Sequence, residues 1–373
     1  MKIDCFKNKL LKSVLITEKI VAKNLSLPIL KNILLQTEKN YLKITATNLE
    51  VGVEIKIPAK IYTEGQITVN PYTFGAFLNN LNTEDKITLI SENGNLKVET
   101  NNNKTLIKGD ETEDFPLLPK VVTGKEIKIK ASDFISGLKS VVFSASVSDI
   151  KPEISGVYIY LNNQNLIFVA TDSFRLAEKS INLSQNYNFD SLIIPLKNSL
   201  EIIRLFDDFE GELKINSDGN QLSIFADNIH FTSRIIDGVY PDYKQIMPKD
   251  FNLNLTVDKN QITQALKLNT IFVNKFNQIN LLINIKNQEI ILNTANQETG
   301  ENTTIINNLK DINLKNEDLL DFNANYNIRY IVDGLNILKQ DEVFIGCNEE
   351  NKPLLIKNPN DKSFNYIIMP VSR

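Results

Sequence analysis

Apolar and polar residues alternate in several short stretches of the chain, which is the pattern of half-buried β-strands. Over Val51–Ile57 every second residue is Val or Ile, so one face of this strand would be apolar. Two longer stretches, Ile87–Glu99 and Leu213–Phe225, consist of alternating halves joined at Gly94 and Gly219. A glycine at such a joint is typical of a hairpin turn. These stretches therefore predict antiparallel sheet.

A second hairpin pattern and two helical patterns recur along the chain. The hairpin occurs three times, at Ile33–Ile44, Tyr158–Phe168 and Leu281–Leu292. Six segments carry apolar residues at the spacing of an amphipathic helix, with one at the start and one near the middle of each third of the chain. These helical segments are 7–21, 71–81, 131–143, 197–206, 257–272 and 325–338.

Corresponding elements lie about one third of the chain apart. Gly94 and Gly219, for example, are separated by 125 residues. This interval is close to the size of a whole domain, whereas the repeats of solenoids and propellers are about 20–50 residues long. We therefore expect three tandem, similar domains of the α+β class, each with two helices packed on antiparallel sheet. Proline-containing linkers at 114–120 and 240–249 would separate domains at 1–121, 122–249 and 250–373.

The composition is that expected of a soluble cytoplasmic protein. Hydrophobic residues make up 42% and charged residues 23% of the chain, near the averages of globular domains. No stretch reaches the roughly 18 apolar residues of a membrane span, and the first residues lack the apolar core of a signal peptide. Cys5 and Cys347 lie far apart, so we expect two free thiols and neither a disulfide framework nor a metal site.

The net charge of −4 is unevenly distributed. The six helical segments together contain more Lys and Arg than Asp and Glu, so the rest of the chain is more acidic than the average. If the helices share one surface, that surface is positive on an otherwise acidic body. Such a surface would hold DNA weakly and without sequence preference. The alternative interpretation is that the lysines only solvate the polar faces of the helices.

The sequence contains no familiar catalytic or cofactor-binding motif. The patterns GxGxxG, GxxxxGK[ST], GxSxG and HExxH do not occur. The single histidine, His230, lies in a strand-like stretch, and Asp172, Asp237 and Asp242 lie in turn-like sequence where capping roles are usual. We therefore expect no catalytic residue, no metal and no cofactor, and we interpret the chain as a binding and assembly protein.

Five motifs carry a resemblance to a known family. They are LPILKNILLQ, DFPLLP, ATDSFRLAE, RIIDGVYPDYKQIMPK and YIIMPVSR, beginning at residues 27, 114, 170, 234 and 366. In this order and spacing they resemble the bacterial sliding clamp, the β subunit of DNA polymerase III, over the whole chain. The resemblance implies a non-catalytic processivity factor. Two copies would form a head-to-tail ring with helices lining the hole, and the ring would encircle duplex DNA without reading its sequence.

The resemblance also implies protein partners. The replicative polymerase α subunit, the clamp loader, other polymerases and mismatch-repair proteins would each dock a linear peptide between the second and third domains. The chain departs from the family at Ser173 and Phe174, where Gly and His are common, and in its tail, where Ser372 looks inserted. We expect the bulkier wall to alter peptide preference. The matching positions are Ile154, Thr171, Ser173, Phe174, Arg175, Leu176, Pro241, Ile246, Ile367, Ile368, Met369, Pro370, Val371 and Arg373.

Further positions follow from the same resemblance. The positions that would face DNA are Lys23, Asn24, Tyr72, Lys197 and Arg204. The contact between the two copies would involve Thr105 and Ile107 of the first domain and Ile271 and Phe272 of the third. A contact between different surfaces of identical subunits closes into a ring when the rotation fits.

Two other functions are considered. A metal-dependent nuclease would need carboxylates that converge on one site, which the dispersed aspartates do not suggest. A clamp-like paralogue that is not loaded on DNA would have the same fold, but the basic helical segments argue against it. The sequence does not fix the peptide consensus or the stability of the dimer.

Overall fold

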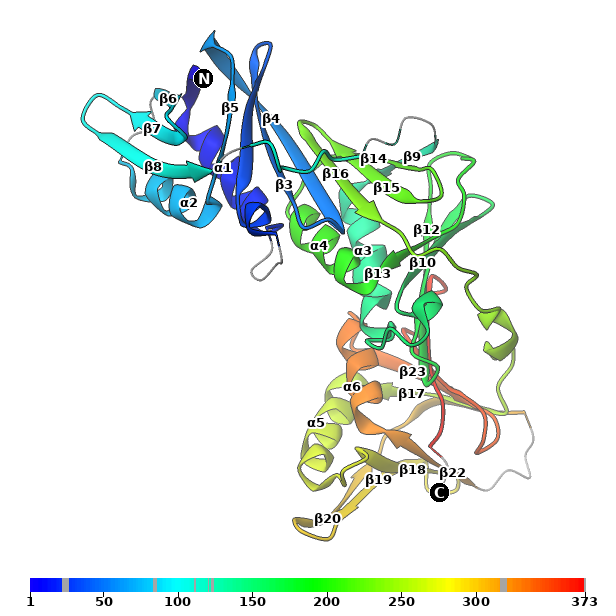
Figure 1. The fold of residues 1–373 in the computed structure, drawn as a ribbon. Helices are drawn as coiled ribbons and strands as arrows, with labels where there is room; N and C mark the ends of the chain where they lie inside the picture. Colours follow the sequence, from blue (N-terminus) through cyan, green and yellow to red (C-terminus); the bar gives the residue numbers. More distant parts are fainter. Residues whose placement is uncertain are drawn as a thin grey trace. The chain divides into compact units, whose positions relative to one another are not determined.

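The computed structural model describes residues 1–21, 27–82, 86–110, 112–119, 121, 124–315 and 321–371. The chain divides into two compact units (Figure 1). The first unit consists of Met1–Ile135 and Gln185–Asp237, and the second of Ser136–Ser184 and Gly238–Arg373.

Six α-helices occur in the described part of the chain, each within or close to a predicted helical segment. Three begin directly after a strand at an Asn or Asp cap: Asn70 accepts from Thr73 N–H, Asp258 from Gln261 N–H, and Asn327 from Arg329 N–H. A cap of this type satisfies a backbone donor that the first turn leaves free. The helices are α1 Lys7–Glu18, α2 Pro71–Asn80, α3 Ala131–Val141, α4 Leu196–Phe206, α5 Lys259–Asn269 and α6 Ile328–Ile337.

The strands confirm the predicted repeat. In each third the order is one strand, a helix, a hairpin with a following strand, a further strand, the second helix and a three-strand meander. The first third contains β1 Lys2–Phe6, β2 Ile33–Glu38, β3 Tyr41–Thr47, β4 Val51–Thr63, β5 Gln66–Val69, β6 Lys86–Glu92, β7 Asn95–Glu99 and β8 Lys104–Asp110. The second contains β9 Lys125–Lys130, β10 Gly156–Asn162, β11 Asn165–Thr171, β12 Arg175–Asn182, β13 Leu192–Pro195, β14 Glu212–Ser217, β15 Gln221–Ala226 and β16 Ile229–Arg234.

The last third follows the same order with one additional strand, β21, which lies beside β17 at the edge of a sheet. Its strands are β17 Leu253–Asp258, β18 Gln278–Asn284, β19 Glu289–Asn296, β20 Gly300–Ile306, β21 Lys310–Leu314, β22 Asp321–Asn327, β23 Glu342–Cys347, β24 Leu354–Lys357 and β25 Phe364–Ile368. Short 3-10 helices occur at η1 Pro28–Lys31, η2 Val142–Ser144, η3 Pro152–Ile154, η4 Tyr243–Ile246 and η5 Thr270–Phe272.

In the first unit a continuous sheet joins strands from the first and second thirds. The strand order is β1-β6-β7-β8-β5-β2-β3-β4-β16-β15-β14-β9. The two thirds meet where β4 pairs antiparallel with β16, from Val51 opposite Ser233 to Ile55 opposite Ile229. The apolar face predicted for Val51–Ile57 is buried here. Helices α1 and α2 lie side by side in this unit (Figure 1).

The second unit has a junction of the same kind. Strands β10-β11-β12-β25-β24-β23-β17-β21 follow one another in one sheet, and β20-β19-β18-β22 form another. Here β12 of the second third pairs antiparallel with β25, the last strand of the chain, with Arg175 opposite Ile368 and Leu176 opposite Ile367. Helices α5 and α6 contact each other, and α5 also packs on β19 and β20.

The predicted linker at 240–249 is more ordered than its composition suggests. It contains η4, and the side chains of Tyr240 and Tyr243 are buried. The Tyr240 ring stacks on Tyr158 with centroids 4.6 Å apart. Tyr243 donates a hydrogen bond to Glu178, and its hydroxyl oxygen also lies 2.8 Å from that of Tyr160. Burial, followed by these hydrogen bonds, raises the pKa of Tyr243 far above its usual value. The segment is therefore fixed to the sheet of the second unit.

The side chains of His230, Cys5 and Cys347 are packed or hydrogen-bonded within the fold. His230 lies on β16, where its Nε2 is 2.6 Å from the Ser223 hydroxyl and its ring stacks on Phe225. Cys5 and Cys347 are free and buried, and burial raises the pKa of each thiol to about 12. No helix among the described residues is long and apolar enough to span a membrane. The described residues also contain no cluster of His, Cys, Asp or Glu suited to a metal ion.

Candidate functional site

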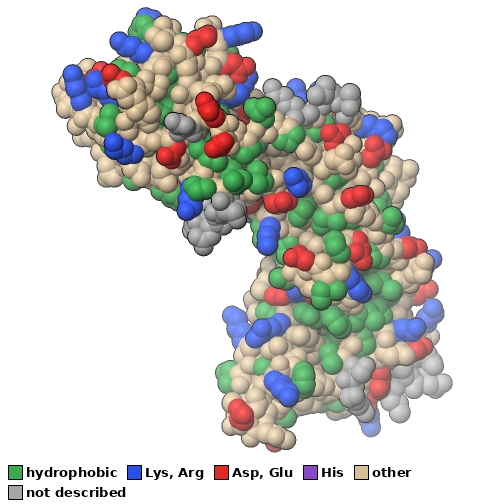
Figure 2. Space-filling view, in the orientation of Figure 1, with side chains coloured by type: hydrophobic (Ala, Val, Ile, Leu, Met, Phe, Trp, Pro, Cys, Tyr) green, Lys and Arg blue, Asp and Glu red, His purple; other side chains and the backbone are tan. Residues whose placement is uncertain are grey.

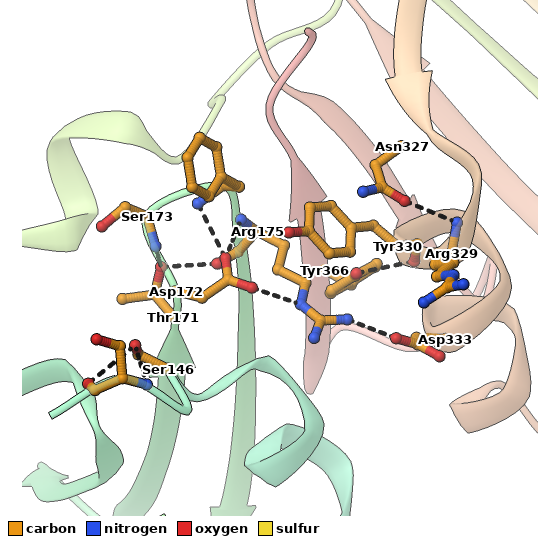
Figure 3. Close-up of polar contacts among 12 residues, drawn as sticks. Ser146, Thr171, Asp172, Ser173, Arg175, Asn327, Arg329, Tyr330, Asp333 and Tyr366 are labelled. Atoms are coloured by element: carbon orange, nitrogen blue, oxygen red, sulfur yellow. Dashed lines mark hydrogen bonds and ion pairs between the residues drawn. The ribbon is translucent and has the colours of Figure 1, made fainter. Parts of the chain in front are cut away.

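The turn between β11 and β12 is the centre of the candidate partner site (Figure 3). The Thr171 hydroxyl donates to the carbonyl oxygen of Arg175 at 2.6 Å and accepts from Ser173 N–H at 3.1 Å. Asp172 Oδ1 accepts from the N–H groups of Phe174 and Arg175 at 2.9 and 3.0 Å. Ser173 has a φ of 77°, in the left-handed region. The turn is therefore tightly defined, and it leaves the Phe174 side chain 62% exposed.

The end of the chain lies against this turn. After β25, Met369 N–H donates to the carbonyl oxygen of Phe174 and Val371 N–H donates to that of Asn325, each at 2.8 Å. These two backbone bonds place the tail between the turn and strand β22. Sequence segments that are almost 200 residues apart are thereby brought together, as the resemblance predicted.

Arg175 connects the turn to helix α6. Its Nε donates to Asp172 at 2.9 Å, and its Nη1 donates to Asp333 at 2.6 Å. The guanidinium also lies over the Tyr330 ring, 4.4 Å from the centroid. Figure 3 shows the side chain reaching from β12 toward Asp333 on the helix. Two nitrogens of the guanidinium are therefore already bound to carboxylates of the same chain. A peptide that contacts Arg175, as the resemblance implies, would share the side chain with these carboxylates.

Neighbouring groups stabilise the positive charge of Arg175. Burial by itself lowers the pKa of Arg175, but the neighbouring Tyr366 hydroxyl and the carboxylates of Asp333 and Asp172 outweigh that effect and raise it. Tyr366 is itself fixed, because its hydroxyl donates to the Tyr330 carbonyl oxygen at 2.8 Å. A half-buried, charged and doubly paired guanidinium of this kind holds its surroundings rigidly.

The predicted peptide positions differ in how far they reach the surface. Four apolar positions are buried within the chain and can shape a groove only from beneath it: Ile154, Leu176, Ile367 and Ile368. The exposed ones are Ser173, Phe174, Pro241, Ile246 and Val371, while Thr171 is buried and Arg175, Met369 and Pro370 are half-buried. Arg373 and Ser372 lie outside the described residues. Leu176, which is 1% exposed, is therefore a core residue in this structure.

A cavity of about 410 Å³ adjoins the tail. Met369, Pro370 and Val371 form one side of it, as expected for a partner groove. The other side consists of residues that the sequence did not indicate: Asn323, Ala324, Asn325, Glu350 and Asn351. They lie on β22 and after β23. The bond from Val371 N–H to Asn325 brings β22 near the tail, and the pairing of β24 with β25 brings the segment after β23 there. No spacing within the sequence signals that contact.

Two of the candidate DNA-facing positions in the first unit, Lys197 and Arg204, carry positive charge. Lys197 and Arg204 are exposed on α4, and Tyr72 is 40% exposed on α2. Lys23 and Asn24 lie outside the described residues. The ammonium group of Lys19, at the end of α1, donates to the Arg204 carbonyl oxygen at 3.4 Å. Lys19 thus joins this group of cations, although the resemblance did not single it out.

Lysine and arginine side chains are scattered among acidic and apolar ones on the face shown in Figure 2. Within α4, Arg204 lies 3.8 Å from Glu201, which partly compensates its charge. The charge pattern therefore fits diffuse attraction, and it does not resemble a concentrated binding site for a charged ligand.

Two strand edges carry the candidate subunit contacts. In β8, Thr105 is half-buried and Ile107 is buried, so Ile107 faces the core of its own unit and Leu106, which is 56% exposed, is the apolar side chain at the surface. The expectation that Ile107 takes part in the contact between two copies stays a prediction. On η5, Ile271 is 63% exposed and Phe272 is half-buried beside the start of β20.

The structure and the comparisons define a DNA clamp of the three-domain type. The DNA polymerase III subunit beta of Pseudomonas aeruginosa superposes with a TM-score of 0.92 at 24% identity, covering 100% of both chains. The DNA polymerase sliding clamp of Bacillus subtilis gives a TM-score of 0.91 at 23% identity, covering 100% of this chain and 99% of the other. The beta sliding clamp of Vibrio cholerae is 26% identical over 348 residues, which is 93% of each protein.

The family assignment rests on matches along nearly the whole sequence. The N-terminal, central and C-terminal domains of the DNA polymerase III beta subunit match residues 1–119, 128–242 and 244–372. The chain belongs to the DNA polymerase III beta subunit family, the bacterial sliding clamps. It is a processivity factor of DNA replication and a non-catalytic accessory subunit of the polymerase.

Proposed function

We propose that two copies of this chain close into a ring around duplex DNA by pairing β8 of each copy with β20 of the other. The repeat supports this arrangement. Within one chain, β4 pairs with β16 and β12 pairs with β25. In the repeat, β20 corresponds to β4 and β12, and β8 corresponds to β16 and β25. Strands β20 and β8 are therefore the two strands at these repeat positions that have no such partner among the described residues.

The edges of both strands are free among the described residues. β20 pairs with β19 on one side only. β8 pairs with β7 from Lys104 to Lys108 and meets β5 only at its last two residues. An unpaired strand edge is a ready-made template for another chain. Pairing β8 with β20 would use the free edge of each of these two strands.

The register of the two junctions within the chain can be applied to the proposed junction between two copies. Gly52 lies opposite Thr232 in the first junction, and Leu176 lies opposite Ile367 in the second. The corresponding pair across the ring would be Glu301 and Leu106, both exposed in the single chain.

The side chains next to this pair fit the same register. Lys104 and Lys108 flank Leu106 on the same outward face of β8, so they would lie diagonally across from Glu301. Opposite charges at such distances favour pairing. Ile271 and Phe272, near the start of β20, would be part of the same contact.

Each copy would contribute three domains, at 1–121, 122–249 and 250–373. Lys19, Lys23, Asn24, Tyr72, Lys197 and Arg204 would then face the DNA. Contacts that reach only the phosphate backbone carry no sequence information. Their weak, salt-dependent attraction lets the ring slide, while closure of the ring retains it. A cytoplasmic location follows from this role in bacterial DNA replication.

The turn at Thr171–Leu176, the η4 segment and the tail would form the groove for partner peptides. Exposed Phe174, Ile246 and Val371 would supply apolar contacts, and Met369 would supply an adaptable thioether. The cavity beside the tail would take a second part of the peptide. Tethering a polymerase in this way raises its effective concentration at the primer end without any new chemistry.

Engineered disulfides test the ring closure. The double variant Leu106→Cys with Glu301→Cys should give covalently closed dimers under mild oxidation, because the two positions lie opposite each other in the proposed register. The control variant combines Leu106→Cys with Ile305→Cys, where the second position is four residues, or about 13 Å, further along β20. Ile305 is also exposed. Equal cross-linking of both variants, or none of either, would contradict the proposed closure.

A further inference from the structure

The turn in the candidate partner site has a close counterpart in the first unit. This counterpart spans Thr47–Val51, between β3 and β4. Its hydrogen bonds run from the Thr47 hydroxyl to the Val51 carbonyl oxygen, from Leu49 N–H to the Thr47 hydroxyl, and from the N–H groups of Glu50 and Val51 to the Asn48 side chain. The same donors and acceptors occur in Thr171–Arg175. Leu49 has a φ of 76°, as Ser173 has 77°.

The strand that closes each junction repeats as well. Arg234 N–H donates to the Glu50 carbonyl oxygen at 2.9 Å, just as Met369 N–H donates to that of Phe174 at 2.8 Å. Val51 lies opposite Ser233 and Arg175 lies opposite Ile368. The first unit therefore contains the same backbone scaffold that carries the candidate partner groove in the second unit.

A cavity of about 280 Å³ lies on this scaffold in the first unit. Its lining comes from the turn and the start of β4 (47 and 49–52), from Gln221 on β15, from the end of β16 (232–234) and from the linker at 116–119. The candidate partner groove is expected to consist of the same three parts: the turn, the linker and the closing strand. At about 280 Å³ the cavity lies just below the usual range for pockets that enclose a drug-sized ligand.

Leu118 occupies the floor of this first-unit groove. A Cβ atom built on Gly52 would lie 2.4 Å from a methyl carbon of Leu118, so the leucine packs directly on the glycine backbone. In the repeat, Gly52 stands where the second unit has Leu176. The adjoining Leu117 is 94% exposed and does not contribute to this contact.

The corresponding linker in the second unit is held differently. There, Tyr243 is fixed to Glu178 and Tyr160, and Ile246 remains 45% exposed. The linker of the first unit thus places an aliphatic side chain on its groove, while that of the second unit is fastened to the sheet by its tyrosine.

We propose that the first-unit groove is a second copy of the partner groove and that Leu118, seated on Gly52, occupies it and confines partner peptides to the second unit. Leu118 is thus a specificity-determining residue of the clamp. This inference rests on the proposed function of the second groove. It explains how a chain with two similar junctions presents a single docking site.

The number of peptides bound per chain tests the proposal. The probe is a synthetic linear peptide from the clamp-binding segment of the cognate polymerase α subunit, titrated calorimetrically. The wild type should bind one peptide per chain. Leu118→Ser removes the occupying side chain, and Gly52→Ala displaces it by adding a Cβ, so each should bind two. Leu200→Ser, at an exposed leucine of the same unit that does not line the groove, is the matched control and should bind one. Thermal unfolding confirms that each variant is folded.

The possible outcomes separate this inference from the function on which it rests. One peptide per chain for the wild type and for both groove variants would overturn it, and so would two for the wild type. No binding by the wild type together with one peptide for Leu118→Ser would contradict the second-unit groove and support the occupied first groove. No binding by any variant would overturn both. Adding Phe174→Ala to Leu118→Ser should weaken only the original site.

Discussion

Arg175 on β12 and Asp333 on α6 are joined by a hydrogen-bonded ion pair of 2.6 Å. This contact links a strand from the second third of the sequence to a helix from the last third. The Nε–H of the same guanidinium donates to Asp172 in the turn that carries Phe174. The geometry of the partner groove therefore depends on a helix that is itself remote in sequence.

Removing the carboxylate of Asp333 should loosen this connection. Because Asp333 is partly exposed, Asp333→Asn should cost about 1–2 kcal/mol, the lower range for hydrogen bonds to charged groups. Thermal unfolding measures the cost. Asp341→Asn is a matched loss of one exposed carboxylate in the same unit and should be close to neutral. Equal shifts for the two variants would mean that the ion pair contributes no more than general charge.

Shortening the exposed ring at the groove should weaken partner binding without affecting the fold. Phe174→Ala removes a side chain that is 62% exposed, so unfolding should change little. Binding of a polymerase-derived peptide should weaken by about 1–3 kcal/mol, as expected for a truncated apolar anchor. Leu176→Ala, by contrast, should reduce stability by about 2–5 kcal/mol because Leu176 is a core residue. Unchanged peptide affinity for Phe174→Ala would place the groove elsewhere.

Charge at the proposed ring contact should separate the two copies. Replacing exposed Leu106 or Ile271 with Asp should bury an unpaired charge in the dimer at a cost of several kcal/mol. Neither side chain is in a core, so the product should be a folded monomer. Sedimentation measures the mass, and circular dichroism checks the fold. Asp at Leu117, which is exposed and belongs to neither β8 nor β20, is the control. A dimer of unchanged stability in the interface variants would contradict the assignment.

Stability of the second unit should fall in acid through Asp361. Burial raises the pKa of Asp361, but hydrogen bonds from Ser363 and the nearby Lys179 lower it below its ordinary value of 3.8 overall. A carboxyl group with a lowered pKa in the folded state stabilises the protein above its ordinary pKa, and this contribution is lost as the pH falls through the lowered value. Asp361→Asn should therefore show a smaller loss of stability between pH 5 and pH 3, measured by urea unfolding. Parallel pH curves for the two proteins would contradict this.

Local pattern was sufficient to predict the repeated elements of the fold. The alternation at Val51–Ile57 and the glycine-centred hairpins specify strands through contacts between near neighbours. The junctions could not be predicted in this way, because the pairing of β12 with β25 joins residues such as Arg175 and Ile368. Only the family resemblance linked those segments before the structure was known.

The resemblance named the segments of the candidate site. It did not indicate which of their side chains reach the surface. Whether a side chain in a strand faces the core or the solvent depends on the layer that covers it. Ile107 and Leu176, which the resemblance singled out, are buried for this reason, whereas the exposed Leu106 was not singled out. Asn325 and Glu350 were missed because they reach the tail only through tertiary contacts. Leu118 was noted only as part of a linker motif, since nothing in the sequence indicates that Gly52 lies beneath it.

Retention on circular DNA tests the central claim most directly. The protein is loaded on nicked circular duplex by its clamp loader, washed at a salt concentration that abolishes binding to short duplexes, and followed after the circle is cut. A sliding ring should stay on the circle through the wash and should leave once the DNA is linear. Binding with the same salt sensitivity on circles and short duplexes, or retention that is unaffected by cutting, would contradict a topologically closed clamp.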